Sequence, residues 1–184
     1  MSEEPRTDKL IAASIQWTQK IMQKIDSILQ EPKAEYKLST DGACIGNPGP
    51  GGWACVLRVD GHVDELFGCA PHTTNSRMEL QAVIEGLKSL NEPCSVAVST
   101  DSQYVQLGIT KWVEMWKAAG WRRSDRRAVL NQDLWRELDE RIALHTVRWK
   151  WVKGHADDPD NLRCHHLANR AARQQISSSG SRSG

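Results

Sequence analysis

The chain has 184 residues, of which 39% are hydrophobic, a size that suits one folded domain with extensions. Its 24 basic and 23 acidic residues nearly balance, so affinity for a polyanion requires charges gathered in one part of the chain. Five widely spaced cysteines without a CxxC pair argue against a disulfide framework and a zinc site. No apolar run approaches the roughly 20 residues that span a bilayer, and the start lacks a signal-peptide pattern. We therefore expect a cytoplasmic protein that does not contact membranes.

Residues 1–34 are predicted to be an amphipathic helical extension. Between Pro5 and Pro32, apolar side chains recur at three- and four-residue spacings, at Ile11, Ile15, Met22, Ile25 and Leu29. Such a stripe must be covered. We expect the helix to dock on its own domain, to self-associate or to bind a protein partner.

Residues 35–175 are predicted to form one α/β domain that begins with three antiparallel strands. The first strand spans 36–44 and is followed by the turn-forming letters NPGPGG. Two further strands, 53–59 and 62–70, lie on either side of an Asp60-Gly61 hairpin signal. A helix over 76–90 follows, with the capping-box pattern SRME at its start.

The second half of this domain is predicted to alternate between strands and helices. In chain order we expect a buried strand at 94–100, helices at 102–108, 111–119 and 131–143, a strand at 145–152 and a helix at 160–175. This order predicts an α/β fold with a mixed sheet covered by helices. The tail, residues 176–184, ends in SSSGSRSG, which has no apolar residue, and is expected to be disordered.

Three acidic residues fall where the predicted elements can bring them together. Asp41 lies on the first strand, Glu79 at the head of the first domain helix, and Asp101 directly after the fourth strand. Taken singly, each has an ordinary explanation as a turn residue, a capping-box partner of Ser76 or a helix N-cap. Taken together, two carboxylates about 4 Å apart repel by about 4 kcal/mol at an effective dielectric constant near ~20, which a bound cation offsets. Oxygen ligands of this kind suit Mg²⁺ or Mn²⁺.

Basic and aromatic residues are concentrated in the segment 111–127. Six basic residues stand there against two acidic ones, interleaved with Trp112, Trp116 and Trp121. Such a mixture suits phosphate contacts and stacking on bases or sugars, with an affinity that falls as salt rises. The alternative is an exposed amphipathic helix whose tryptophans pack on its neighbours. The basic residues are Lys111, Lys117, Arg122, Arg123, Arg126 and Arg127.

Four segments in order resemble the signature segments of type 1 ribonuclease H: STDGACIGNPGPGGW, TTNSRMELQAVIEGL, STDSQYV and WVKGHADDPDNLRCHHLANRAA. The resemblance covers about residues 36–175. It implies a ribonuclease H-like fold with a five-stranded mixed sheet. It also implies an endonuclease that cuts the RNA strand of an RNA/DNA hybrid with two Mg²⁺ or Mn²⁺ ions, leaving 5′-phosphate and 3′-hydroxyl ends.

The resemblance also assigns roles to residues. It makes Asp41, Glu79 and Asp101 the metal-binding carboxylates, and His155 a mobile histidine that assists proton transfer or product release. The 111–127 segment resembles a basic protrusion that grips the DNA strand. Residues expected to bind the hybrid are Cys44, Asn47, Asn75, Gln103, Trp112, Lys117, Trp121 and Asn131.

One position departs from the family pattern. The last helix of the family normally supplies a fourth acid, an aspartate directly after a cysteine, whereas this chain has His165 after Cys164. An imidazole adds no negative charge and is softer than a carboxylate, so direct ligation by His165 predicts a shift from Mg²⁺ toward Mn²⁺. A second reading places His165 near the site, where it positions water or phosphate while three acids hold the metals. A third makes the domain a hybrid-binding module with weakened catalysis.

Overall fold

The computed structural model describes residues 18–20, 22, 35–153 and 158–180 of the chain. The chain divides into two compact units, Met1–Lys33 and Ala34–Gly184. In the first unit, residues 18–20 and 22 are helical. The rest of the expected N-terminal helix lies outside the described residues, so its docking, self-association or partner binding stays a prediction.

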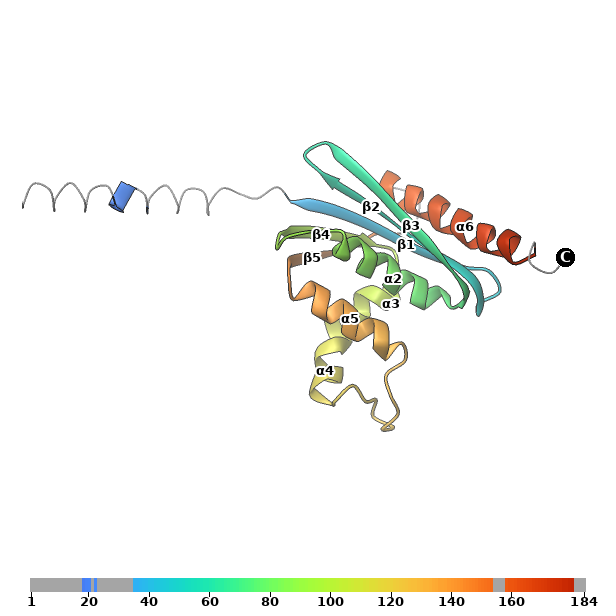
Figure 1. Ribbon diagram of the computed structural model, residues 1–184. Coiled ribbons are helices and arrows are strands. Elements are labelled where there is room, and N and C mark those ends of the chain that lie inside the picture. The colour runs from blue at the N-terminus through green and yellow to red at the C-terminus, as the bar shows by residue number, and fades with distance from the viewer. Residues whose placement is uncertain (1–17, 21, 23–34, 154–157, 181–184) are drawn as a thin grey trace, which may run out of the picture. The chain divides into compact units, whose positions relative to one another are not determined.

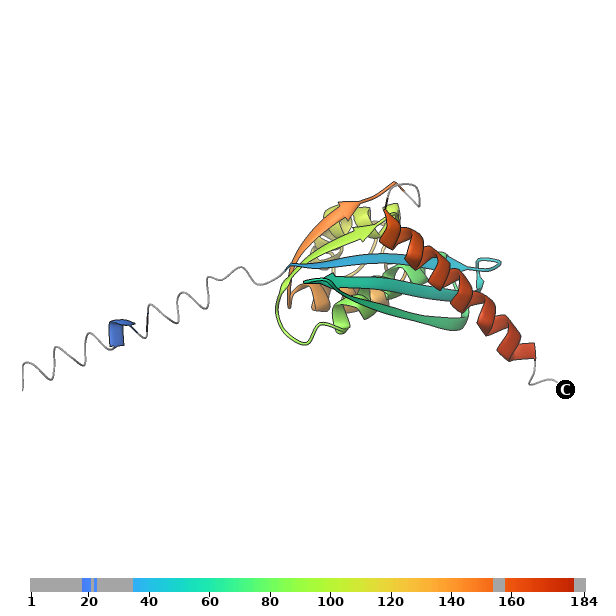
Figure 2. The ribbon, with the colours of Figure 1, turned by 90° about the horizontal axis from the view of Figure 1, so that it is seen from above.

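The second unit is built on a five-stranded sheet with the strand order β3-β2-β1-β4-β5 (Figures 1 and 2). β1 and β2 pair antiparallel, as do β2 and β3, whereas β4 lies parallel to both β1 and β5. The predicted mixed sheet is therefore confirmed. Its strands are β1 (Tyr36–Cys44), β2 (Gly49–Val59), β3 (His62–Thr73), β4 (Ser95–Thr100) and β5 (Thr146–Trp151).

Helices cover both faces of this sheet (Figures 1 and 2). α6 (Pro159–Gly180) packs on one face against β1, β2 and β3, and the other helices lie on the opposite face. The predicted α/β architecture is thus confirmed. The helices on the second face are α2 (Asn75–Lys88), α3 (Gln103–Leu107), α4 (Val113–Ala118) and α5 (Gln132–Ile142), with a π-helical turn, η1 (Gly108–Trp112), between α3 and α4.

One apolar cluster lies on each face of the sheet, because successive strand residues point to opposite sides. Leu38 on β1 is fully buried in the larger cluster, with Leu80 of α2 and Trp135 of α5. Cys164 and Leu167 of α6 are buried in the smaller one. β1 therefore packs against α2 on one face and against α6 on the other.

The elements differ from the sequence prediction at several ends. β2 begins at Gly49 rather than at residue 53, because Gly51 and Gly52 pair with the end of β1 and leave only residues 45–48 for the turn. The N-cap of α2 is Thr74, whose side chain accepts a hydrogen bond from the Arg77 backbone at 3.4 Å, so the prediction of a capping box starting at Ser76 was wrong.

Two helix ends also lie elsewhere than expected. The stretches 102–108 and 111–119 are joined by η1 into one continuous helical path instead of being separated by a loop. α6 runs on to Gly180, past the expected start of the tail at 176. Once a helix is formed, each added residue gains a backbone hydrogen bond without a new nucleation cost. Residues 181–184 lie outside the described part of the chain.

Candidate active site

Asp41 and Asp101 are neighbours because β1 and β4 are parallel. The register pairs Thr40 with Thr100 across the two strands, so the next residue on each strand is an aspartate. Asp41 stays within β1, where it pairs with Ala54 of β2, and Asp101 is the first residue after β4. The ordinary alternative of an Asp41-Gly42 turn is therefore wrong, since both residues lie inside a strand.

Glu79 reaches the same point from the first turns of α2. The approach depends on Gly42, because a Cβ at this position would lie 2.3 Å from the Glu79 backbone nitrogen. Only a residue without a side chain lets the strand and the helix come this close. One carboxylate oxygen of Glu79 accepts a hydrogen bond from the Asn75 side chain at 3.2 Å rather than capping the helix at Ser76.

The three acids form a compact and largely buried carboxylate cluster. One side-chain oxygen of each of Asp41, Glu79 and Asp101 lies within 4.8 Å of the others. Asp41 is 4% exposed and Glu79 6% exposed. Burial, followed by the charges of Asp41 and Asp101, raises the pKa of Glu79 well above its ordinary value. The protein thus gathers three carboxyl groups where water screens the repulsion between their charged forms poorly.

This cluster fits a divalent cation. Oε2 of Glu79 is buried and has no hydrogen-bond partner among the described residues. A buried carboxylate oxygen without a partner is costly, and hard cations such as Mg²⁺ and Mn²⁺ take such oxygens as ligands. The donor set and the unpartnered oxygen therefore match the metal ions expected from the sequence.

α6 is anchored to the two residues of β1 that precede Asp41. The Asn161 side chain donates to the carbonyl of Thr40 at 3.3 Å, and the Cys164 thiol donates to the carbonyl of Ser39 at 3.2 Å. Asn161 is fully buried, so its bond is shielded from competing water. These contacts set His165, the next residue along, against Asp41.

His165 lies beside Asp41. Its Nδ1 is 3.0 Å from Oδ2 of Asp41, and its side chain is 38% exposed. The side chain of Asn169, one turn later, donates to the His165 carbonyl at 2.9 Å and lies 3.3 Å from Nε2 of the imidazole. The imidazole is thus held between an aspartate and an amide, at the edge of the carboxylate cluster.

Trp151 contacts the backbone of Asp101. Its indole N–H donates to the Asp101 carbonyl at 3.3 Å, from the end of the neighbouring strand β5. The Val152 backbone N–H donates to the Thr100 carbonyl at 3.0 Å. Two successive carbonyls, those of Thr100 and Asp101, therefore accept hydrogen bonds from Val152 and Trp151 at the end of β5. These bonds fix the backbone at Asp101.

Three of the expected hybrid-binding residues gather at the start of α2. The Asn47 side chain accepts from the Asn75 backbone at 3.0 Å, which joins the β1–β2 turn to the helix. The Cys44 thiol donates to the Thr73 carbonyl at 3.4 Å. Since Asn75 also donates to Glu79, these residues adjoin the carboxylate cluster.

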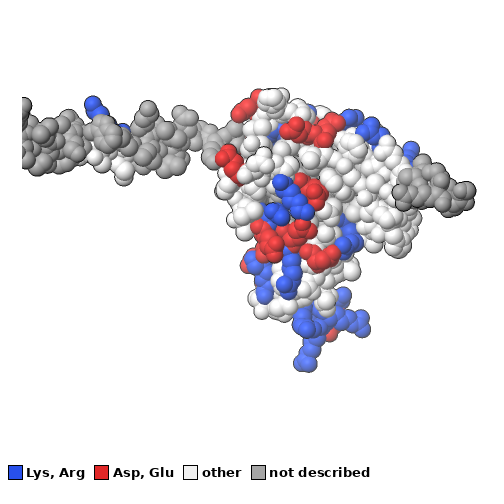
Figure 3. Space-filling view, in the orientation of Figure 1, with Lys and Arg blue, Asp and Glu red and all other residues white. Residues whose placement is uncertain are grey.

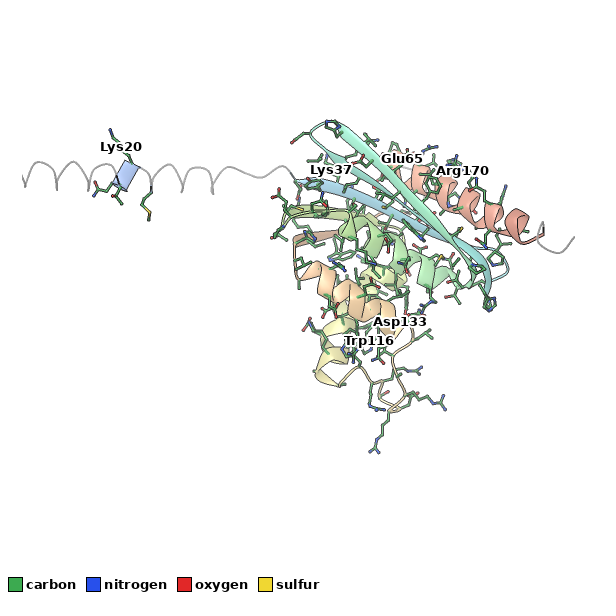
Figure 4. All side chains as sticks on the ribbon, in the orientation of Figure 1. Lys20, Lys37, Glu65, Trp116, Asp133 and Arg170 are labelled. Carbon is green, nitrogen blue, oxygen red and sulfur yellow. The ribbon has the colours of Figure 1, made fainter. Side chains whose placement is uncertain are left out.

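Asn131 and Gln103 lie on the second face. Asn131 precedes α5 with a left-handed backbone (φ 57°), and its amide donates to the Tyr104 hydroxyl at 3.2 Å. Arg77 of α2 lies nearby and makes two hydrogen bonds to Asp133 of α5, at 2.9 and 2.6 Å; Asp133 is labelled in Figure 4. Gln103 is exposed at the start of α3.

The basic segment forms the tip that Figure 3 shows in blue, over the loop between α4 and α5. Trp112 and Trp116 pack together with ring centroids 5.7 Å apart, and Trp116 packs on Trp135 at 5.5 Å. Trp121 is only 9% exposed. Lys117 forms ion pairs with Glu114 and Asp139 at 3.2 and 3.0 Å. The alternative of tryptophans packed on their neighbours therefore describes Trp116 and Trp121. Lys117 is already paired with two acidic residues in the protein itself.

Sequence reasoning missed the residues that position the acids. Gly42, Asn161 and Trp151 do so through backbone proximity or single hydrogen bonds, which leave no periodic pattern in the sequence. His155, the expected mobile histidine, lies outside the described residues. No described helix is both long and apolar enough to cross a membrane.

Comparison with known proteins agrees with this geometry. The family model described as RNase H matches residues 33–173. Ribonuclease H of Solibacter usitatus is 55% identical over 144 residues, which is 78% of this chain and 99% of that protein. Ribonuclease HI of Neisseria meningitidis is 54% identical over 137 residues, covering 74% of this chain and 94% of the relative.

Solved structures give the same result. LC9-RNase H1, described as a type 1 RNase H with the type 2 active-site motif, is 32% identical with a TM-score of 0.71, covering 79% of this chain and 75% of its own. LC11-RNase H1, solved in complex with an RNA/DNA hybrid, shares the fold at 18% identity and a TM-score of 0.58, covering 77% of this chain and 99% of its own. The sheet order, the convergence of three carboxylates at its centre and these matches agree that the chain belongs to the type 1 ribonuclease H family.

Proposed function

We propose that this chain is an endonuclease that hydrolyses the RNA strand of RNA/DNA hybrids and leaves 5′-phosphate and 3′-hydroxyl ends. The observation that carries the proposal is the carboxylate cluster of Asp41, Glu79 and Asp101, within 4.8 Å of one another in a chain of the ribonuclease H family. The proposal keeps the cytoplasmic location expected from the sequence.

Asp41, Glu79 and Asp101 would hold two divalent cations, Mg²⁺ or Mn²⁺. When bound, such a pair supplies a water of lowered pKa and stabilises charge on the entering and leaving oxygens of the phosphodiester. The chain contributes a rigid set of ligands: Asp41 is held within β1, and Asp101 follows a strand end fixed by Val152 and Trp151. Rigid ligands keep the reacting groups in line, which is the main protein contribution to this class of reaction.

In this proposal His165 acts at the edge of the carboxylate cluster, either as a further metal ligand or as a group that positions Asp41. Its Nδ1 lies 3.0 Å from Asp41, which supports a role in holding that carboxylate in place. An imidazole at this position leaves the site one negative charge short of the usual four-acid pattern. The missing charge weakens the binding of both divalent cations, and direct ligation by the imidazole would favour Mn²⁺, which accepts nitrogen ligands more readily than the harder Mg²⁺. We therefore propose a shift of metal preference toward Mn²⁺.

Proton handling is assigned to His155, by match of motif. An imidazole is the side chain whose ordinary pKa lies nearest to neutral pH, so it can release and take up protons during turnover. Telling RNA from DNA requires contacts to 2′-hydroxyl groups across a shallow minor groove. Cys44, Asn47 and Asn75, which adjoin the carboxylate cluster, are the proposed readers, and Gln103 and Asn131 extend the surface over the second face.

The basic tip would bind the DNA strand. Arg122, Arg123, Arg126 and Arg127 are all exposed there, and arginine suits phosphate because its planar head donates two parallel hydrogen bonds. Trp112 is half-buried and keeps part of its ring accessible for stacking. Trp121, with 9% of its surface exposed, supports the tip from within.

The test is cleavage of an end-labelled RNA/DNA hybrid beside single-stranded RNA, double-stranded RNA and double-stranded DNA, each titrated with Mg²⁺ and with Mn²⁺. Asp101→Asn, which keeps the shape of the side chain and removes its charge, is the control. We expect hybrid-only cleavage by the natural chain and none by the variant. Tight hybrid binding without cleavage in either metal would mean that the domain is a binding module instead.

A further inference from the structure

We propose that one side of α6 is a binding site for phosphates of the RNA strand, next to the cut. The site consists of His165, Asn169 and Arg173, called here the α6 stripe. This inference rests on the proposed function and extends it to a surface that lies outside the basic tip. It is carried by the direction in which successive residues of α6 point and by a hollow between their side chains.

Contacts identify which side of α6 adjoins the cluster. His165 touches Asp41 at 3.0 Å, so its side of the helix is the one next to the carboxylates. Arg163 instead pairs with Glu65 of β3 at 2.8 Å, and Arg170 lies over the ring of Phe67, also on β3. Figure 4 labels Glu65 and Arg170, on the neighbouring elements β3 and α6. The helix therefore has one side next to the carboxylate cluster and another next to β3.

The α6 stripe continues the first of these sides. Residues four apart lie on the same side of a helix, so His165, Asn169 and Arg173 follow one another. Asn169 contacts His165 through its carbonyl, at 2.9 Å, and through the imidazole ring. At about 1.5 Å per residue, the stripe extends roughly 12 Å from the cluster.

The stripe borders a surface hollow with the chemistry of an anion site. The hollow has a volume of about 430 Å³ and is lined by His165, His166, Asn169, Arg170, Arg173 and Gln174. All six side chains can donate hydrogen bonds, counting the histidines in a suitable tautomer, and two carry a permanent positive charge. From residue 161 to residue 176 the helix contains three arginines and no acidic residue. Phosphate is the anion that such a row of donors beside a nuclease site would take.

The position of the hollow selects the RNA strand. The cut phosphate lies at the carboxylate cluster and belongs to the RNA, and the stripe begins at the residue that touches Asp41. The basic tip lies on the other face of the sheet, beyond α4 (Figure 1), where it is assigned to the DNA strand. The phosphates that continue from the cut along α6 are therefore those of the strand being cut.

The test compares Arg173→Gln with Arg163→Gln in the full chain. Both variants remove one positive charge from an exposed residue of α6, but Arg163 pairs with Glu65 and does not line the hollow. Binding of a fluorescent RNA/DNA hybrid is measured by anisotropy in chelator, which keeps the hybrid intact, over a range of salt concentrations. Circular dichroism checks that both variants are folded.

We expect Arg173→Gln to weaken binding by roughly three- to tenfold at low salt and to reduce the slope of log affinity against log salt by about one. Arg163→Gln should keep both values. A hybrid whose RNA strand carries uncharged methylphosphonate linkages should bind the natural chain and Arg173→Gln equally. A hybrid with the same linkages in its DNA strand should preserve the difference.

An unchanged salt slope for Arg173→Gln, an equal loss for Arg163→Gln, or a defect that persists on the RNA-neutral hybrid would overturn the inference. Cleavage of the unmodified hybrid in Mg²⁺ or Mn²⁺ by the natural chain is measured in parallel. If that cleavage occurs and Arg173→Gln behaves as the natural chain, the α6 inference alone fails. If the natural chain neither binds nor cuts the hybrid, the proposed function fails with it.

Discussion

His165 Nδ1 lies 3.0 Å from Oδ2 of Asp41, so the residue that replaces the family's fourth acid touches the buried aspartate of the carboxylate cluster. Asp41 is 4% exposed, whereas the imidazole is 38% exposed on its outer side. An imidazole in place of a carboxylate spares the metal-free protein a fourth negative charge. The same replacement of an aspartate by His165 leaves less negative charge at the site to attract a metal cation.

Replacing this residue by an acid should therefore strengthen metal binding. We expect His165→Asp to tighten Mg²⁺ binding on the order of tenfold, the lower end of what neighbouring groups contribute at metal sites. The margin by which Mn²⁺ binds more tightly than Mg²⁺ should narrow, because a carboxylate favours the harder cation. Titration calorimetry with each metal measures both effects. His166→Asp adds the same charge one residue away, and an equal gain in that control would contradict a specific role for His165.

Glu79 links stability to pH in the metal-free protein. Burial and the neighbouring aspartates raise its pKa well above the ordinary value, so the folded protein favours the protonated form. Its contribution to stability is therefore fully present below the ordinary pKa and is lost as pH rises through the raised one. Glu79→Gln should raise the free energy of unfolding by roughly 1–3 kcal/mol near neutral pH, since it replaces a buried ionisable carboxyl group by a neutral amide.

The check is urea unfolding of both proteins in chelator between about pH 8 and about pH 5. The advantage of Glu79→Gln should shrink as pH falls, because the natural glutamate then becomes protonated. Glu35, Glu65 and Asp133 have lowered pKa values, but both proteins carry them and their effects cancel. An advantage that stays constant across this range would show that charge on Glu79 is not the cause.

Gly42→Ala should disturb the carboxylate cluster by pushing α2, which carries Glu79, away from β1. The added Cβ would lie 2.3 Å from the Glu79 nitrogen and 2.6 Å from the Met78 carbonyl carbon, so β1 and α2 must separate. Overpacking of this kind costs about 1–3 kcal/mol of stability, and a displacement near 1 Å lowers catalysis by about a hundredfold. Gly61→Ala is the control, because the φ of 83° at Gly61 strains a residue with a side chain, but no neighbouring atom lies within 4 Å of the added Cβ. It should lose stability without losing hybrid cleavage; equal cleavage losses in the two variants would contradict the close approach.

Trp151→Phe should separate positioning of Asp101 from substrate binding. The change keeps an aromatic ring and removes the N–H that donates to the backbone carbonyl of Asp101 at 3.3 Å. One neutral hydrogen bond contributes about 0.5–1.5 kcal/mol, so the Mg²⁺ concentration for half-maximal cleavage should rise about three- to tenfold while KM for the hybrid stays constant. Trp149→Phe, two residues earlier on β5, packs on the core and should lower only the melting temperature. The same metal shift in both variants would point to general loosening of the strand.

The fold followed from the sequence where apolar periodicity and turn residues agreed. The limits of β1, a strand that is followed by the turn-forming letters NPGPGG, were predicted to the residue. Those of β5 were predicted to within one residue at each end, because apolar and polar residues alternate along it. Prediction was poorer where two local preferences compete. Gly49 to Gly52 looked like a turn, yet pairing with β1 draws these residues into β2. Thr74 and Ser76 are both of residue types that favour the N-cap, and the helix begins after Thr74.

The acids of the candidate site could be picked out because each lies in a segment that resembles a signature segment of the family. Their convergence depends on the parallel pairing of Thr40 with Thr100, which no local pattern reveals. The contact between His165 and Asp41 depends on how α6 packs on β1, through Asn161 and Cys164. Positioning contacts of this kind require the tertiary structure.

The central claim is that Asp41, Glu79 and Asp101 act as one metal-binding unit that drives hybrid cleavage. The most direct test follows cleavage of a labelled RNA/DNA hybrid and the melting temperature of the protein in the same Mg²⁺ titration, for the natural chain and Glu79→Gln. A ligand that binds only the folded state raises the melting temperature as it saturates its site. The account predicts that cleavage and stabilisation appear over the same Mg²⁺ range in the natural chain and that Glu79→Gln shows neither. Cleavage by Glu79→Gln at the natural rate, or cleavage by the natural chain without metal, would contradict it.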